Sequence, residues 1–103
     1  METVKRFKDT LKKDRPPDLT SDSLLALWYD AKGAWHEAHE LVQESQSHEA
    51  AWVHAYLHRK EGDLWNADFW YRRAGKSRYD GPLDEEWELI SASLLKRANG
   101  MFG

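Results

Sequence analysis

Apolar residues recur at helical spacing through most of the chain, and glycine or proline interrupts them at intervals. The steps of three and four residues between leucine, alanine and aromatic positions predict helices over about 22–32, 35–44, 48–60, 64–74 and 83–98. Near the start, Val4, Phe7 and Leu11 repeat the spacing, and Pro16-Pro17 ends this amphipathic stretch. No segment alternates as a strand does, so we expect an all-α fold.

Capping residues mark where the predicted helices begin and end. Ser21 or Asp22 is placed to cap the first helix after the prolines, and Ser47 is placed to cap the one that follows the polar stretch 45–47. Gly62 and Gly75 follow the last apolar positions of two helices and are expected to end them. The stretch 76–82 is predicted to be a loop.

A segment of the chain is echoed 29 residues later, at the junction between predicted helices. Gly33-Ala34-Trp35-His36-Glu37-Ala38 corresponds to Gly62-Asp63-Leu64-Trp65-Asn66-Ala67, and Ala26 corresponds to Ala55. An internal period of this size, with small residues where two helix axes approach, is typical of stacked helical hairpins. We therefore predict hairpin 1 over 20–46 and hairpin 2 over 48–76, within one domain over 1–103.

The echoed positions resemble degenerate tetratricopeptide (TPR) repeats. Leu25, Ala26, Tyr29, Ala38 and Val42 fill the family's apolar, small and aromatic positions in the first unit, and the second unit supplies Ala55, Ala67, Tyr71 and Ala74. The second unit departs from the motif at Ala51, His54 and His58. A helical bundle without repeats stays open as the alternative. The run 65–75 also resembles one in small microbial proteins, which implies no function.

Two hairpins leave both ends of a stack uncovered, so capping elements are expected. We predict that the basic N-terminal segment 1–17 covers one end, where it meets Leu24 and Trp28. We predict that a capping helix over 83–98 covers the other, where it meets Phe69 or Trp70.

Composition excludes several classes of protein. The chain has 103 residues, a net charge of -3 and no cysteine, which removes disulfides, thiolate metal sites and cysteine nucleophiles. No apolar run is long enough for a membrane span, and no membrane partner is expected. The first residues are charged and do not form an apolar signal, so we expect a cytoplasmic protein. Aromatic and basic residues over 70–78 could stack on bases and bind phosphates. Because the chain as a whole has a negative net charge, nucleic acid is not expected as a partner.

The sequence holds little that indicates chemistry. His54 and His58 are four residues apart on one helix face, with Glu61 beyond them, which is a spacing that can hold a metal ion. Partly buried imidazoles explain the same pair, so no metal or other cofactor is expected. His36 and His39 lie three apart and do not match the zinc-protease motif, which needs four. Gly75-Lys76-Ser77 lacks the earlier glycine of a phosphate loop. We predict no catalytic residues and no enzyme.

The predicted binding surface lies on the first helix of each hairpin. Trp52, Tyr56, Arg59 and Lys60 share one face in hairpin 2, and Leu27 and Asp30 are among their counterparts in hairpin 1. Aromatic anchors beside an Arg fork suit a peptide that carries a carboxylate. We therefore expect a non-catalytic interaction module that binds a peptide or associates with itself. A dimer interface and plain core packing of Trp52 and Tyr56 stay open, as does a small metal-binding or catalytic protein that uses His54 and His58.

Overall fold

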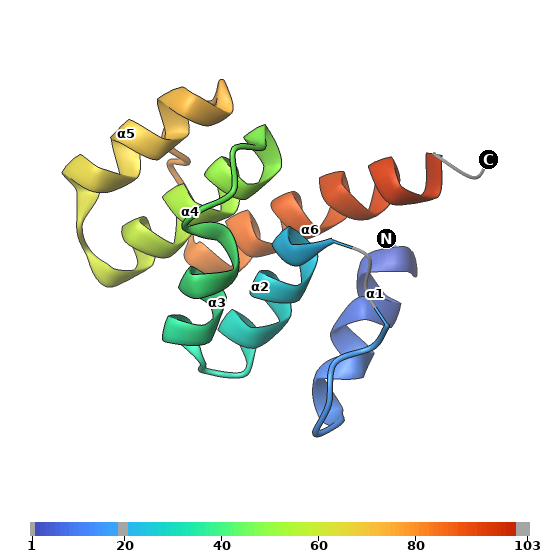
Figure 1. The fold of residues 1–103 in the computed structure, drawn as a ribbon. Helices are drawn as coiled ribbons and strands as arrows, with labels where there is room; N and C mark the ends of the chain where they lie inside the picture. Colours follow the sequence, from blue (N-terminus) through green and yellow to red (C-terminus); the bar gives the residue numbers. More distant parts are fainter. Residues whose placement is uncertain (1, 19–20, 101–103) are drawn as a thin grey trace.

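The structure, a computed structural model, describes residues 2–18 and 21–100. Every regular element in these residues is helical. In chain order the elements are α1 (Glu2–Asp9), the 3-10 turn η1 (Thr10–Lys12), α2 (Asp22–Ala31), α3 (Trp35–Val42), α4 (His48–Glu61), α5 (Leu64–Ala74) and α6 (Leu83–Gly100). Figure 1 shows α2 to α5 grouped together, with α6 running from the middle of the molecule toward the side on which α1 lies. The radius of gyration is 12.8 Å, close to the roughly 13 Å of a compact chain of this length. The all-α prediction is confirmed.

The ends of the helices follow local chemistry. The Ser21 and Ser47 hydroxyls accept hydrogen bonds from the N–H groups of Leu24 and Ala50, which caps α2 and α4 as predicted. Gly62 ends α4 at a φ of 90° and Gly75 ends α5 at a φ of 73°, a backbone conformation that glycine adopts without strain. The predicted bounds of α5 agree with the structure, whereas α3 ends at Val42, two residues earlier than predicted.

The helices pack in pairs through small residues. Helix α2 lies against α3, and α4 lies against α5, while α4 also contacts α2 and α3. Ala26 and Ala38 are fully buried in the first pair, and Ala55 and Ala67 are fully buried in the second. Side chains of this size let two helix axes approach closely. The prediction that the echoed alanines set the helix contacts agrees with this burial.

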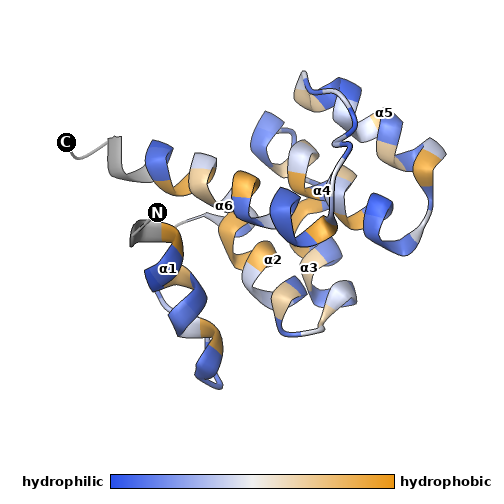
Figure 2. Cartoon of the chain, turned by 180° about the vertical axis from the view of Figure 1, so that it is seen from behind, coloured by the Kyte–Doolittle hydropathy of each residue, from blue (hydrophilic) through white to orange (hydrophobic). Residues whose placement is uncertain are grey.

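The N-terminal segment folds onto the rest of the chain through its apolar face. Val4 and Phe7 of α1 are buried, and the Phe7 ring stacks on Trp87 of α6 with a centroid distance of 5.5 Å. The Trp28 indole N–H donates a hydrogen bond to the Thr10 hydroxyl over 3.1 Å. Figure 2 shows hydrophilic residues along the other faces of α1. The prediction that this segment meets Trp28 is confirmed.

Helix α6 packs against α1, α2 and α4. Its Trp87, Ile90 and Leu94 belong to the same buried cluster as Leu27 and Tyr56. The prediction that Phe69 or Trp70 meets this helix is wrong, because α6 lies along the first helices of the two hairpins. Within the described residues, no helix is long and apolar enough to cross a bilayer.

Candidate functional site

The face predicted to bind a peptide is largely covered by the chain itself. Leu27, Asp30 and Tyr56 are exposed by 0%, 2% and 2%, so the prediction that they line an open groove is wrong. The cause is α6, whose Trp87 indole N–H donates to the Leu27 backbone oxygen over 2.9 Å. The helix predicted to cap the end of the stack therefore lies in the predicted groove.

The polar residues of that face bind one another. Asp30 accepts hydrogen bonds from the Tyr56 hydroxyl and from the Lys60 ammonium group, each over 2.9 Å. Burial and the nearby Asp30 carboxylate raise the pKa of Tyr56, which keeps the phenol protonated as the donor. Lys60 remains partly exposed. These three residues therefore tie α2 to α4, with their polar groups paired inside the chain.

Arg59 was predicted to bind the carboxylate of a peptide, and in the structure it binds a carboxylate of this chain. Its guanidinium donates to Glu86 of α6 over 2.8 Å and also to the Gly81 backbone oxygen. Tyr71 of α5 donates to the other oxygen of Glu86. Burial raises the pKa of Glu86, although the hydrogen bonds from Tyr71 and Arg59 oppose this effect. Glu86 therefore joins α4, α5 and α6.

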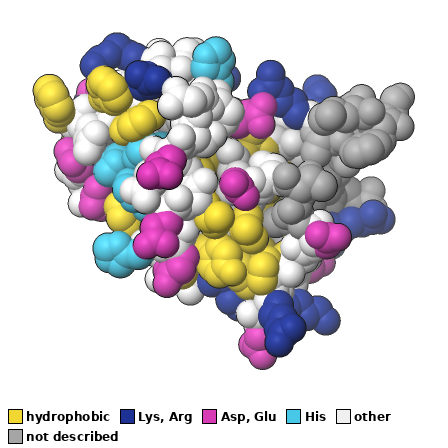
Figure 3. All heavy atoms as spheres, viewed as in Figure 1, with side chains coloured by type: hydrophobic (Ala, Val, Ile, Leu, Met, Phe, Trp, Pro, Cys, Tyr) yellow, Lys and Arg dark blue, Asp and Glu magenta, His cyan; other side chains and the backbone are white. Residues whose placement is uncertain are grey.

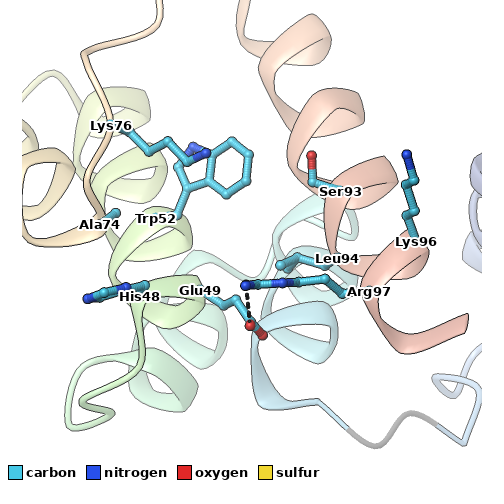
Figure 4. A pocket seen from close by; sticks show the side chains of 9 residues that line it. All are labelled: His48, Glu49, Trp52, Ala74, Lys76, Ser93, Leu94, Lys96 and Arg97. Atoms are coloured by element: carbon cyan, nitrogen blue, oxygen red, sulfur yellow. Dashed lines mark hydrogen bonds and ion pairs between the residues drawn. The ribbon is translucent and has the colours of Figure 1, made fainter. Parts of the chain in front are cut away.

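Trp52 faces an open pocket, separate from the smaller one of about 320 Å³ that Asp30, Tyr56 and Lys60 line with Trp87 of α6. The pocket has a volume of about 550 Å³ and lies between α4, the end of α5 and α6. Its walls are formed by His48, Glu49, Trp52, Ala74, Lys76, Ser93, Leu94, Lys96 and Arg97. Figure 4 shows Trp52 and Lys76 side by side on one wall, with Ser93 and Leu94 on the opposite wall.

The charges of this pocket are mainly positive. Lys76 places its ammonium group 4.3 Å from the Trp52 ring centroid, and Lys96 is exposed on α6. Arg97 reaches across to Glu49 with a distance of 2.6 Å between Nη1 and Oε1 (Figure 4). Three cationic side chains thus surround one carboxylate that is already paired, beside an apolar surface.

His54 and His58 belong to a cluster of three histidines. His39 of α3 joins them, and one ring nitrogen from each lies within 4.8 Å of the others. The Nε2 atoms of His39 and His54 are 3.0 Å apart, and the Nδ1 atom of His58 is 2.6 Å from Glu61 Oε2. Burial lowers the pKa of His54 to about 3 and also lowers that of His39, so both imidazoles are neutral at pH 7.

His39 is the site residue that sequence reasoning missed. From the sequence it was considered only with His36, in a spacing that does not match the zinc-protease motif. His36 is exposed, and Figure 3 shows histidine side chains at the surface of the molecule. His39 follows the buried Ala38 and lies toward α4, where its ring is 4.7 Å from that of His54. The signal in the sequence was its position next to Ala38 on the buried side of α3.

The aromatic and basic residues over 70–78 are held within the chain. Arg73 lies over the Phe69 and Trp70 rings, with centroid distances of 5.8 and 5.5 Å. Arg78 pairs with Asp68 over 2.7 Å. Neither arrangement requires a nucleic acid.

Comparison with known proteins adds no family and no relative to this geometry. The chain matches no protein-family model, and neither the curated proteins nor the solved structures include a significant match.

Proposed function

We propose that this chain is a non-catalytic interaction module that binds an acidic segment of another protein in the pocket between α4 and α6. The observation that supports the proposal is the pairing of Trp52 with Lys76 at the mouth of a pocket whose unpaired charges are positive. An indole supplies apolar contact area, and the cations supply partners for carboxylates. A peptide with an acidic residue next to an apolar one matches both.

The proposed architecture is a pair of stacked, TPR-like hairpins, with α6 in the position of a further first helix. Gly33 and Gly62 both have positive φ angles, at the turns between the helices of the two hairpins. Ala26 and Ala55 lie at equivalent buried positions in α2 and α4. These equivalences support a repeat in which α2, α4 and α6 share one side.

The position of α6 explains why the proposed site is smaller than the predicted groove. Glu86 and Trp87 cover the face around Tyr56 and Arg59, as an acidic and aromatic peptide would. Near Leu94 the pocket separates α6 from α4, and Trp52 remains partly exposed there. The proposed partner would thus bind beside a segment of the chain that already uses the same chemistry.

Selection from a displayed library of random linear peptides tests the proposal, with the purified chain as bait. The test variant is Trp52→Ala combined with Lys76→Glu, which removes the apolar wall and reverses one charge. Arg59 is left unchanged because it holds Glu86. Trp65→Ala is the matched control, since Trp65 is 85% exposed on α5 and lies outside the pocket.

The expected result is enrichment of peptides with acidic and apolar residues, whose affinity falls by more than about tenfold in the test variant, equivalent to about 1.4 kcal/mol. The control should bind as the original chain does. Enriched peptides that bind both variants equally would remove this pocket as the site. If light scattering shows a dimer that depends on Trp52, the partner in the pocket is a second copy of the chain and not a peptide.

A further inference from the structure

The three histidines lie on two helices that the chain brings together. Residues His54 and His58 are one turn apart on α4, and their rings stack with a centroid distance of 4.8 Å. His39 approaches from α3, with its ring at 4.7 and 5.2 Å from the other two. Three imidazoles from two elements therefore converge on one point, which the spacing of His54 and His58 alone does not achieve.

Hydrogen bonding within the chain does not use all the nitrogens of this cluster. His54 is 4% exposed, and its Nδ1 atom has no hydrogen-bond partner. Buried polar atoms without partners are uncommon in folded proteins, since they give up water without a replacement. The Nε2 atoms of His39 and His54 face each other 3.0 Å apart. In the metal-free chain, one of them must carry a proton and donate it to the other. An ion bound by these two Nε2 atoms would account for the contact between the rings, because neither nitrogen would then carry a proton.

Glu61 gives His58 the orientation of a metal ligand. Its carboxylate lies 2.6 Å from Nδ1 of His58, which places the ring proton on that nitrogen and leaves the lone pair on Nε2. Histidines that bind metals commonly donate their other nitrogen to a carboxylate in this way, which fixes the ring and raises its basicity.

Two tryptophans hold the remaining rings in place. Trp35 lies parallel to His39 at a centroid distance of 4.9 Å, and Trp70 lies parallel to His54 at 4.0 Å. The Trp35 indole N–H donates to the Leu57 backbone oxygen over 2.9 Å, which ties this arrangement to α4. The three imidazoles are therefore held close together before any ligand binds.

We propose that His39, His54 and His58 form a binding site for a divalent transition-metal ion, with zinc as the best match. Zinc accepts three imidazoles in tetrahedral geometry, and bonds of about 2.0–2.1 Å place their nitrogens roughly 3.3 Å apart. The observed nitrogens lie within 4.8 Å of one another, and those of His39 and His54 are 3.0 Å apart, so the rings must come closer for all three to bind one ion. The chain has no cysteine, so a thiolate site is excluded. The ion would link α3 to α4, independently of the pocket at Trp52.

Titration of the EDTA-treated, dialysed chain with ZnCl₂ tests the site by calorimetry and by thermal unfolding. We expect one equivalent to bind and the unfolding temperature to rise with zinc concentration, because an ion that binds only the folded state stabilises it. Co²⁺ in place of zinc should give the visible absorption bands of a tetrahedral ion.

His39→Gln is the decisive variant, since this partly exposed side chain can change without disturbing the buried face of α4. Its affinity for zinc should fall by more than about 100-fold. His36→Gln is the matched control on the same helix, where the exposed side chain is outside the cluster and affinity should not change. Glu61→Gln should lower the affinity for zinc by about tenfold or more.

A second group, His58 with Glu61 and Asp63, also has its ligand atoms within 4.8 Å of one another and is the competing location. Asp63→Asn distinguishes the two candidate sites, because Asp63 is not part of the three-histidine site. Asparagine can still cap α5, so the fold should be kept. Loss of zinc binding in Asp63→Asn but not in His39→Gln would overturn the proposal. Absence of any zinc-dependent heat or thermal shift in the unaltered chain would do the same.

Discussion

The Trp87 indole N–H donates a hydrogen bond of 2.9 Å to the backbone oxygen of Leu27, which lies 60 residues earlier in the chain. The same indole stacks on Phe7. One side chain of α6 therefore fixes the position of both α1 and α2, and its size and its donor can be tested separately.

Trp87→Ala should lower the free energy of unfolding by about 3–5 kcal/mol, because it leaves a cavity under α1 and α2. Trp87→Phe keeps most of the ring but removes the donor to Leu27, and should cost about 1–2 kcal/mol. Urea unfolding followed by circular dichroism measures both. Trp65→Ala, a change of the same kind at an exposed position, should stay within about 0.5 kcal/mol. Equal losses for Trp87→Ala and Trp65→Ala would contradict the packing described for α6.

Tyr56→Phe removes the hydroxyl that donates to Asp30 and leaves a buried carboxylate oxygen without that donor. A loss of about 2 kcal/mol in the free energy of unfolding is expected. Tyr29→Phe makes the same chemical change on α2, where the half-buried ring has an edge contact with Trp28 and no hydroxyl hydrogen bond is found in the described part of the chain. That variant should lose less than about 0.5 kcal/mol. If the two variants lose equal stability, Asp30 does not depend on Tyr56.

The raised pKa of Glu86 gives a pH dependence with a definite sign. The folded chain takes up this proton at a higher pH than the unfolded chain, for which the pKa is 4.5. Glu86 therefore contributes more stability as the pH falls from 7 toward 4.5, and this contribution is lost as the pH rises through the folded pKa. The difference in unfolding free energy between the original chain and Glu86→Gln should grow in favour of the original chain on acidification. A difference that shrinks instead would show that Arg59 lowers the pKa below 4.5.

Gly62 ends α4 in the left-handed region, and a methyl group built onto it meets no atom within 4 Å. Gly62→Ala should therefore cost only backbone strain, roughly 1 kcal/mol. Gly62→Asn should cost less, because asparagine tolerates this conformation. Thermal unfolding of the two variants checks the order, and a larger loss for asparagine would rule out backbone strain as the cause.

Helix ends could be predicted from the sequence because their causes are local. Ser47 and Gly62 act through hydrogen bonds and backbone angles within one turn of the helix, so neighbouring residues were sufficient evidence. The burial of Ala38 and Ala67 followed from the echoed pattern for a similar reason. The position of α6 depends on contacts between residues 60 positions apart, and periodicity gives only its apolar face, not the surface that face covers.

The candidate sites show the same limit. His54 and His58 could be paired from their spacing on one helix, but His39 joins them through the packing of α3 on α4. Tyr56 and Asp30 were predicted on one face, which is confirmed by their hydrogen bond, yet whether that face is open depended on α6. Trp52 and Lys76 meet because α5 returns alongside α4.

The late position of α6 in the chain has a consequence for synthesis on the ribosome. Leu27 and Tyr56 are complete long before Trp87 and Ile90 leave the exit tunnel, so the surface that these later residues cover is open to solvent during translation. Chains are made at about 5–20 residues per second, whereas helices form in microseconds or less. The apolar face around Leu27 therefore stays uncovered until α6 has emerged, and a chain that ends before residue 83 would keep it exposed.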